Sequence, residues 1–269
     1  MSVLSFLKGS NVFVFDTETT GLPSGSPTGW GSYWDYRMNE KYNNCRIVSI
    51  AWSSINNFDR DNIQTSISID SPNSPNSLIT RISHYLRYPE GFTDVPTTHI
   101  HGISYEELLT KGMPLNVILS IYGLGKSLLE ADYIVAHNAG FDYHVLMNEL
   151  YRLSQKNKLC KPTVSIENNI NNINNIHHNI HHNIAELCII HLQDLKNGGR
   201  IICSGDLSVD ICKLEFPIKT NTYLGNKKAK KYKMPKLCEL YKHFYGKDFE
   251  NAHSADGDVK ALLEIMKMM

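Results

Sequence analysis

Short apolar runs separated by polar breaks fill the N-terminal part of the chain, a pattern that predicts β-strands. Residues 11–16 are almost continuously apolar and are rich in β-branched and aromatic side chains, which is typical of a central strand covered on both faces. Residues 46–52 and 64–70 alternate, and we expect them to form a meander with the first strand. Residues 22–45 are rich in Gly, Ser, Pro and Asn and predict a loop.

Helical signals follow these strands. Ser104 and Glu107 have the spacing of a capping box ahead of a short helix. From Pro114 to about Glu130, apolar residues recur at three- and four-residue steps and predict one longer helix. A short apolar strand at 133–136 precedes a helix over about 141–157. This order of elements predicts a mixed α/β sheet with helices on its faces.

Residues 166–184 consist almost entirely of Asn, His and Ile, a low-complexity composition with little capacity to specify packing. We therefore predict a low-complexity insertion in a loop, at about 161–195, inside a single domain that spans 1–269. Regular patterns resume afterwards with one strand and two helices, at 200–203, at about 237–245 and from Ser254 to the end.

Composition narrows the function classes. The 269 residues include 27 Lys and Arg against 27 Asp and Glu, so the net charge is zero and any attraction to nucleic acid must come from local patches. No apolar run approaches the roughly 18 residues of a membrane span, and a signal peptide is not expected. The six cysteines form no CxxC pair. These features predict an intracellular protein, cytoplasmic or nuclear, that is not secreted and has no membrane partner.

Two acidic residues stand at the end of the first predicted strand. Asp16 and Glu18 are two positions apart, so their side chains point the same way from a strand. Two carboxylates at the centre of a sheet are costly unless a positive charge lies between them, and Mg²⁺ or Mn²⁺ prefers such oxygen ligands. Taken alone, the pair would favour a solvated loop start, and only partner carboxylates elsewhere in the chain favour the metal site.

Two further acids open predicted helices. An aspartate such as Asp142 or Asp258 in a first helical turn can simply complement the helix dipole, and a lone histidine such as His253 is more often structural than catalytic. What favours function is their common placement, because strand ends and the helix starts that follow them are where open α/β sheets bind ligands.

Three motifs, DTETTG at 16–21, HNAGFD at 137–142 and H-x4-D at 253–258, together resemble the exonuclease motifs of the DEDDh family of 3′–5′ exonucleases. That family includes the epsilon (proofreading) subunit of bacterial DNA polymerase III. The likeness covers most of the chain in the expected order and departs at 22–45 and 161–195. Flanking segments resemble the same family, at 46–52, 98–104 and 235–259.

The resemblance implies an RNase-H-like fold, a mixed five-stranded sheet flanked by helices, and a metal-dependent 3′–5′ exonuclease that releases nucleoside 5′-monophosphates. It implies two Mg²⁺ or Mn²⁺ ions. Asp16, Glu18 and Asp258 would hold the ion that carries the attacking water, Asp16 would also reach the second ion, and Asp142 would bind that ion through water. His253 would be the general base, a role that suits an imidazole near neutral pH.

The resemblance also suggests substrate-binding residues around the 3′-terminal nucleotide. Leu22 could instead be a core residue and Asn138 a turn residue. The positions that match the family's nucleotide pocket are Thr17, Thr19, Leu22, His101, Ile103 and Asn138.

A Lys-rich stretch at 219–236 contains seven lysines and no acid, with two tyrosines interleaved. Cations for phosphates and rings for bases suit a single-stranded or frayed 3′ end that enters an acidic metal site. A solvated loop explains the same composition. The lysines expected to contact substrate are Lys227, Lys228, Lys230 and Lys231.

Two other signals carry less weight. Residues 120–127 approximate a phosphate-binding P-loop, but the first glycine is missing and the segment has a helical pattern. Four histidines within 177–182 form two pairs spaced four residues apart, which on a helix could bind Zn²⁺, but no acid or cysteine completes a site.

Two rival functions stay open. The chain could be a catalytically silent exonuclease-like module that binds nucleic acid or a polymerase or other replication partner, although competent residues at all five catalytic positions count against it. It could also trim RNA, because contacts to the 2′-hydroxyl decide between RNA and DNA. We favour DNA as the substrate.

Overall fold

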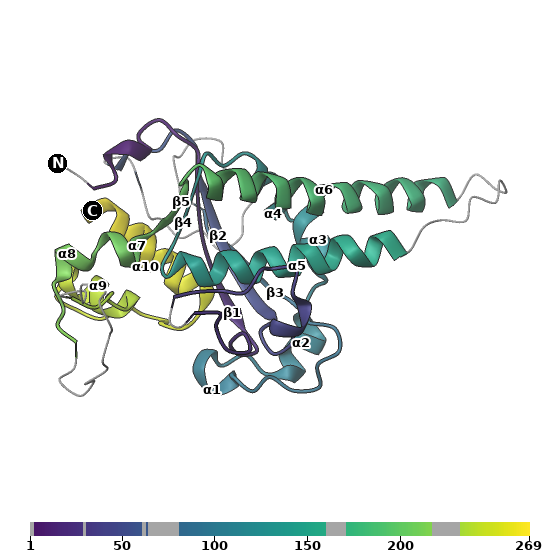
Figure 1. Ribbon diagram of the computed structural model, residues 1–269, viewed down its shortest axis with the longest axis horizontal. Helices are drawn as coiled ribbons and strands as arrows, with labels where there is room; N and C mark the ends of the chain where they lie inside the picture. Colours follow the sequence, from purple (N-terminus) through teal and green to yellow (C-terminus); the bar gives the residue numbers. More distant parts are fainter. Residues whose placement is uncertain (1–2, 29–30, 61–62, 64–80, 160–170, 217–231) are drawn as a thin grey trace.

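A five-stranded sheet runs through the centre of the molecule, with helices on both of its faces (Figure 1). The structure is a computed structural model, and it describes residues 3–28, 31–60, 63, 81–159, 171–216 and 232–269. The strands are β1 (Val12–Thr19), β2 (Ile47–Ile55), β3 (Ser83–Leu86), β4 (Tyr133–Ala136) and β5 (Ile201–Cys203).

The strand order is β3-β2-β1-β4-β5. Strand β2 is antiparallel to both β1 and β3, whereas β1 and β4, and β4 and β5, are parallel. The predicted mixed α/β sheet is thereby confirmed, and its arrangement is consistent with the RNase-H-like fold that the resemblance implies. Strand β1 lies at the centre, as its apolar sequence predicts.

Helices of very different length connect the strands. Ser104 caps α2 as expected, because its side chain accepts a hydrogen bond from the Glu107 N–H at 3.2 Å. The helical elements are η1 (Ser5–Leu7), η2 (Asn39–Lys41), α1 (Thr98–His101), α2 (Tyr105–Lys111), α3 (Leu115–Ser120), α4 (Leu124–Leu129), α5 (Ala139–Leu159), α6 (Asn171–Asn197), α7 (Ser204–Leu207), α8 (Val209–Cys212), α9 (Leu237–Tyr245) and α10 (Ala255–Met268).

The two faces of the sheet pack into separate hydrophobic clusters. Phe13 and Phe15 of β1 lie in the cluster formed with α3, α4, α5 and α6. Val12 and Val14 lie in the cluster formed with α9 and α10 on the opposite face. Because side chains alternate along a strand, the same alternation assigns the next even positions of β1 to the α10 face.

One predicted helix is interrupted in the structure, and one predicted strand lies outside the described residues. The single helix expected from Pro114 to Glu130 is divided into α3 and α4, because Gly123 adopts a left-handed conformation with φ of 82°. A left-handed residue interrupts the helical hydrogen-bond ladder, and glycine has no Cβ that would penalise it. The strand expected at 64–70 lies outside the described residues, and the third strand of the sheet is β3.

The Asn-rich tract provides the second correction. Helix α6 begins at Asn171, so the loop predicted over residues 171–195 is in fact helical. Its last turns are anchored, since Ala185, Cys188, Leu192 and Leu195 recur at three- and four-residue steps and are buried in the core. Helix α6 lies along α5 (Figure 1). That the tract is an insertion within a single domain stays a prediction.

The described helices include none with the length and apolar character required to cross a bilayer, although α6 is 27 residues long. The five cysteines among the described residues are all free thiols.

Candidate active site

The acidic residues gather where β1 extends beyond its neighbour. Strand β4 pairs only with residues 12–14 of β1, which leaves the edge of the following residues without a strand partner on that side. The Asp142 side chain occupies this edge from the first turn of α5. The backbone N–H and the hydroxyl of Thr17 both donate to Asp142 Oδ1, at 3.1 and 2.7 Å. The end of β1 and the start of α5 are therefore locked together.

Three other carboxylates meet on the α10 face. Asp16, Glu18 and Asp258 each offer an oxygen within 4.8 Å of the others. Helix α10 delivers Asp258, because it packs on β1 and β2 and its first turn is capped by Ser254, whose hydroxyl accepts from the Gly257 N–H at 3.3 Å. Residues 242 positions apart in the chain thus come together, as the sequence motifs predict.

His253 lies in a strained turn just before α10. Both Asn251 and His253 have left-handed φ angles, 58° and 67°, and such outliers cluster at functional sites. A Cβ on Gly257 would lie 2.2 Å from the Asn251 carbonyl oxygen, so only glycine lets this turn fold onto the helix. The His253 N–H donates to Asp258 Oδ1 at 3.3 Å, while the imidazole is exposed beside the acids.

The electrostatics of the four acids are unfavourable in the metal-free protein. Burial, reinforced by the charges of Asp142, Asp258 and Glu18, raises the pKa of Asp16 well above its ordinary value. Burial and the charges of Asp258 and Asp142 raise the pKa of Glu18 to about 8. Burial raises the pKa of Asp142 to about 7 despite two hydrogen bonds from Thr17. Burial likewise raises the pKa of Asp258 to about 6.

The donor set fits a hard divalent cation. Within the described ranges, no Lys or Arg forms an ion pair with any of the four acids. Crowded, partly desolvated carboxylates are stable only when a positive charge compensates them. All the available ligand atoms are carboxylate oxygens, which suit Mg²⁺ or Mn²⁺ rather than softer metals. Asp16, Glu18 and Asp258 could hold such an ion directly. Asp142 is hydrogen-bonded to Thr17, the residue between Asp16 and Glu18 on β1.

Some of the expected nucleotide-binding residues are also brought to this end of β1. Thr97 Oγ1 donates to the Thr19 carbonyl oxygen at 2.6 Å, and His101 Nε2 lies 2.9 Å from the same hydroxyl. His101 therefore approaches the site through Thr97. Ile103, in contrast, is buried in a small cluster with Val48 and neighbouring residues, so its side chain contributes to packing.

The remaining predicted contacts are mixed. Leu22 is 72% exposed, which excludes the alternative that it is a core residue. Asn138 has φ of 60° in the turn before α5, as its turn interpretation predicts, and its Oδ1 accepts from the Tyr33 hydroxyl at 3.5 Å. The four lysines proposed to contact substrate, Lys227, Lys228, Lys230 and Lys231, lie outside the described residues.

The sequence does not predict a series of polar contacts made by His84. His84 of β3 contacts Ser49 Oγ through Nε2 at 2.8 Å and Asp256 Oδ1 through Nδ1 at 3.4 Å. Ala51 pairs with both Asp16 and His84, so the imidazole shares a cross-strand row with the first acid. No sequence pattern predicts this link, because β3 is only four residues long and lies outside the predicted strands.

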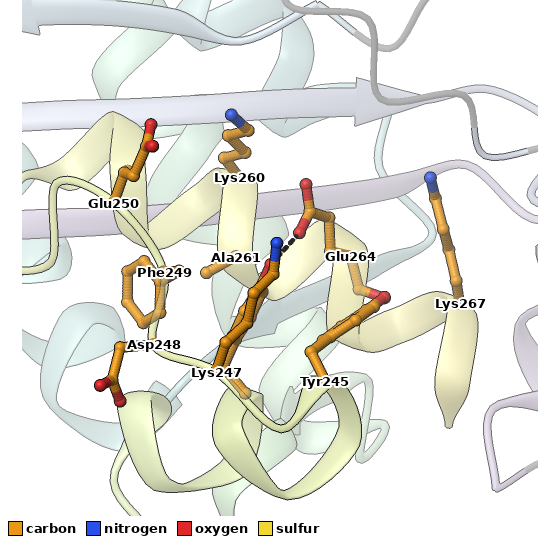
Figure 2. A pocket seen from close by; sticks show the side chains of 11 residues that line it. Tyr245, Lys247, Asp248, Phe249, Glu250, Lys260, Ala261, Glu264 and Lys267 are labelled. Atoms are coloured by element: carbon orange, nitrogen blue, oxygen red, sulfur yellow. Dashed lines mark hydrogen bonds between the residues drawn. The ribbon is translucent and has the colours of Figure 1, made fainter.

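A hollow with a different lining lies beside α10, outside this site. It measures about 570 Å³ and lies between α9, the following loop and α10 (Figure 2). Its lysines, Lys247, Lys260 and Lys267, are interspersed with Asp248, Glu250 and Glu264 along its walls. This alternation of charges gives the hollow no dominant sign, and none of the four acids lines it.

Similarity to known proteins is confined to a weak structural resemblance. The sequence matches no protein-family model and no curated protein. Among solved structures, a moderately thermophilic Exonuclease I from Methylocaldum szegediense aligns with 14% identity and a TM-score of 0.34. The alignment covers 53% of this chain and 24% of that enzyme, so the chain spans about a quarter of its length.

Proposed function

We propose that this protein is a metal-dependent 3′–5′ exonuclease of the DEDDh type, which hydrolyses phosphodiester bonds at the 3′ end of nucleic acid. The observation that carries the proposal is the convergence of Asp16, Glu18 and Asp258 within 4.8 Å, with Asp142 fixed beside them. These acids come from three distant parts of the chain, and their mutual repulsion calls for cations. The five residues named by the sequence motifs all lie at this one end of β1.

The residues divide the work between metal binding and proton transfer. Asp16, Glu18 and Asp258 would hold one ion and Asp142 would help to hold a second, with Asp16 shared between them. When bound, such a pair of ions supplies an activated water and stabilises negative charge on the phosphorus. Thr17 keeps Asp142 oriented through its two hydrogen bonds.

His253 is the proposed general base. Its imidazole is exposed on a turn that the backbone bond to Asp258 ties to the acids, so it can reach a water held there. Proton transfer by a positioned side chain contributes roughly 10²- to 10⁴-fold in rate. His253→Gln should therefore reduce the rate by about that factor while leaving metal binding intact.

The substrate is proposed to be a single-stranded or frayed 3′ end of DNA, in the cell interior. Thr19 and His101 lie where the terminal nucleotide would meet the end of β1. Leu22, Asn138 and the four lysines of 227–231 complete the proposed contacts, whereas Ile103 contributes packing beneath them. RNA trimming is the alternative chemistry, and a silent module that binds nucleic acid or a replication partner is the alternative without chemistry.

An assay of the direction of cleavage tests the proposal. Oligonucleotides labelled at the 5′ end, of DNA and of RNA, would be incubated with the protein and Mg²⁺, and a duplicate would carry a 3′-terminal phosphate. We expect a ladder that shortens from the 3′ end and releases 5′-monophosphates, with His253→Gln strongly slowed. Tight binding without any cleavage in Mg²⁺ or Mn²⁺ would favour the silent module instead.

A further inference from the structure

A second hollow, of about 320 Å³, lies between the segment that follows β1 and helices α5 and α6. Its volume is in the range of small-molecule sites, about 300–1,000 Å³. We call it the aromatic hollow, because rings form most of its wall. The residues that matter to the argument are Tyr33, Trp34, Tyr36, Tyr143, His144 and Lys196.

The aromatic hollow borders the acidic site through Tyr33. The Tyr33 ring rests on the first turn of α5, where a Cβ on Gly140 would lie only 2.8 Å from Tyr33 Cε2. Its hydroxyl donates to Asn138 Oδ1 at 3.5 Å. Asp142 belongs to the same turn of α5. A strand that left the four acids along α5 would therefore pass close to this ring.

The rings of the hollow are held in place before any ligand arrives. Tyr33 stacks on His144, with ring centroids 4.8 Å apart and planes 18° from parallel. His144 Nδ1 lies 2.6 Å from the Gly140 carbonyl oxygen and therefore donates its proton to it, while Nε2 accepts from Lys196 Nζ at 3.0 Å. Burial lowers the pKa of His144 to about 4, in agreement with this neutral form.

Positive charge surrounds the rings. Lys196 Nζ lies 4.7 Å from the centroid of Tyr143, and Lys41 Nζ lies 4.5 Å from that of Trp34. The acid on the wall, Asp35, is already paired with Arg37 through two hydrogen bonds of 2.9 and 2.6 Å. Flat rings flanked by lysines are the combination with which proteins bind single-stranded nucleic acid.

We propose that the aromatic hollow binds an unpaired nucleobase of the strand whose 3′ end lies at the four acids, stacked against the Tyr33 platform with Lys196 near its phosphate. This proposal rests on the proposed function, since it assigns the path of that substrate. It specifies a single strand, because a base that is paired in a duplex cannot enter the hollow. It predicts little sequence preference, since every base has a π-face.

Fluorescence of 2-aminopurine tests the site directly. One 2-aminopurine would be moved stepwise from the 3′ end of a short oligothymidylate, with the protein in Ca²⁺ and the length of the oligonucleotide checked on a gel. We expect quenching at one position a few nucleotides from the end. Tyr33→Leu should abolish that quenching and weaken binding about 5- to 100-fold, the usual effect of removing one stacked ring.

Two variants serve as controls. Tyr33→Phe keeps the ring and should keep the quenching, and Tyr122→Leu removes a tyrosine whose ring contacts Tyr85 instead and should change nothing. Equal quenching and affinity in wild type and Tyr33→Leu would overturn the proposal, as would equal losses in Tyr33→Leu and Tyr33→Phe. Parallel reactions in Mg²⁺ separate the two proposals. Shortening without Tyr33-dependent quenching overturns only the base site, and quenching without shortening overturns only the nuclease.

Discussion

The single buried carboxylate of Glu149 and the cluster of four acids, of which Asp142 is buried and the other three are half-buried, have opposite surroundings. Glu149 of α5 is 1% exposed and accepts hydrogen bonds from Arg46 Nε and Nη2, at 2.8 and 3.0 Å, and from Arg87 Nη1 at 2.9 Å. Arg87 Nη2 forms an ion pair with the same carboxylate at 2.8 Å. The Ile47 N–H donates to the same carboxylate. Burial alone would raise the pKa of Glu149, but the two guanidinium groups reverse the effect and lower it.

The four acids at the end of β1 have the burial without the guanidinium groups, and their pKa values rise instead. The contrast shows that this chain supplies its own cations where an acid is structural. The four acids have no such internal cation among the described residues, and we propose that they bind one from solution. Glu149, paired with two arginines, therefore contributes to the stability of the fold. The crowded acids of the cluster instead destabilise the fold, as buried charges at functional sites usually do.

Removing one acid of the cluster should have the largest effect. We expect Asp16→Asn to lower the rate of oligonucleotide hydrolysis by at least about 10³-fold, because it removes a ligand shared by the metal site, where charge stabilisation is worth several kcal/mol. Asp210→Asn, on α8, is the matched control and should retain activity. A variant Asp16→Asn with near wild-type rate would remove the distinction between the two groups of acids.

Removing the structural acid should instead cost stability. Glu149→Gln leaves Arg46 without its carboxylate and Arg87 with only Glu90, at 3.7 Å, and breaking a buried ion pair in this way costs about 3–5 kcal/mol. Urea denaturation should show this loss, whereas Asp16→Asn should be as stable as the metal-free wild type or more so. If Glu149→Gln unfolds at the wild-type midpoint, the ion network is not what compensates this carboxylate.

The pH dependence should have opposite signs in the two regions. Acids whose folded pKa is raised stabilise the fold below their unfolded pKa and lose this contribution as pH rises through the folded value. In the presence of a metal chelator, the free energy of unfolding should therefore fall as the pH rises to about 8, through the pKa values of Asp258, Asp142 and Glu18.

The contribution of Glu149, whose pKa is lowered, is present above its unfolded pKa and is lost as pH falls through the folded value. Thermal denaturation across pH checks both signs. Asp16→Asn should flatten the alkaline decline, and Glu149→Gln should not. An alkaline decline that is identical in wild type and Asp16→Asn would contradict the assignment.

The smallest effect is expected at His84, a positioning residue that links β2 and β3 to the start of α10. One hydrogen bond of this kind is worth about 0.5–1.5 kcal/mol, so His84→Ala should slow hydrolysis by roughly tenfold or less. His84→Gln, which can keep a bond to Ser49, should restore part of the rate. A loss as large as that of Asp16→Asn would place His84 among the metal-binding residues.

The sequence predicted the parts of the site that follow from local periodicity. Alternation alone placed Asp16 and Glu18 on one face of β1, and Ser254 marked the start of α10 correctly. His84 could not be found in this way, because its role depends on pairing across two strands. Tyr33 was hidden for a similar reason: it lies in a loop without periodicity, and only the packing against Gly140 gives it a place.

Tertiary context also explains the errors in the fold. Gly123 divides a helix whose apolar spacing continues through the break, so periodicity could not reveal it. The Asn-rich tract is helical because residues from Ala185 onward bury one face of α6 against the core, and packing overrides the composition of the preceding repeats.

Metal binding tests the central claim most directly. Isothermal titration of Mn²⁺ into metal-free protein at neutral pH, with the thermal midpoint recorded alongside, should show binding at the acid cluster and a rise in stability of about 2.7 kcal/mol at a hundredfold excess over Kd. Both effects should be lost in Asp16→Asn and kept in Glu149→Gln at a temperature where that variant is folded. If wild-type protein and Asp16→Asn bind Mn²⁺ equally, or neither binds it, the four acids are not a metal site and the account is contradicted.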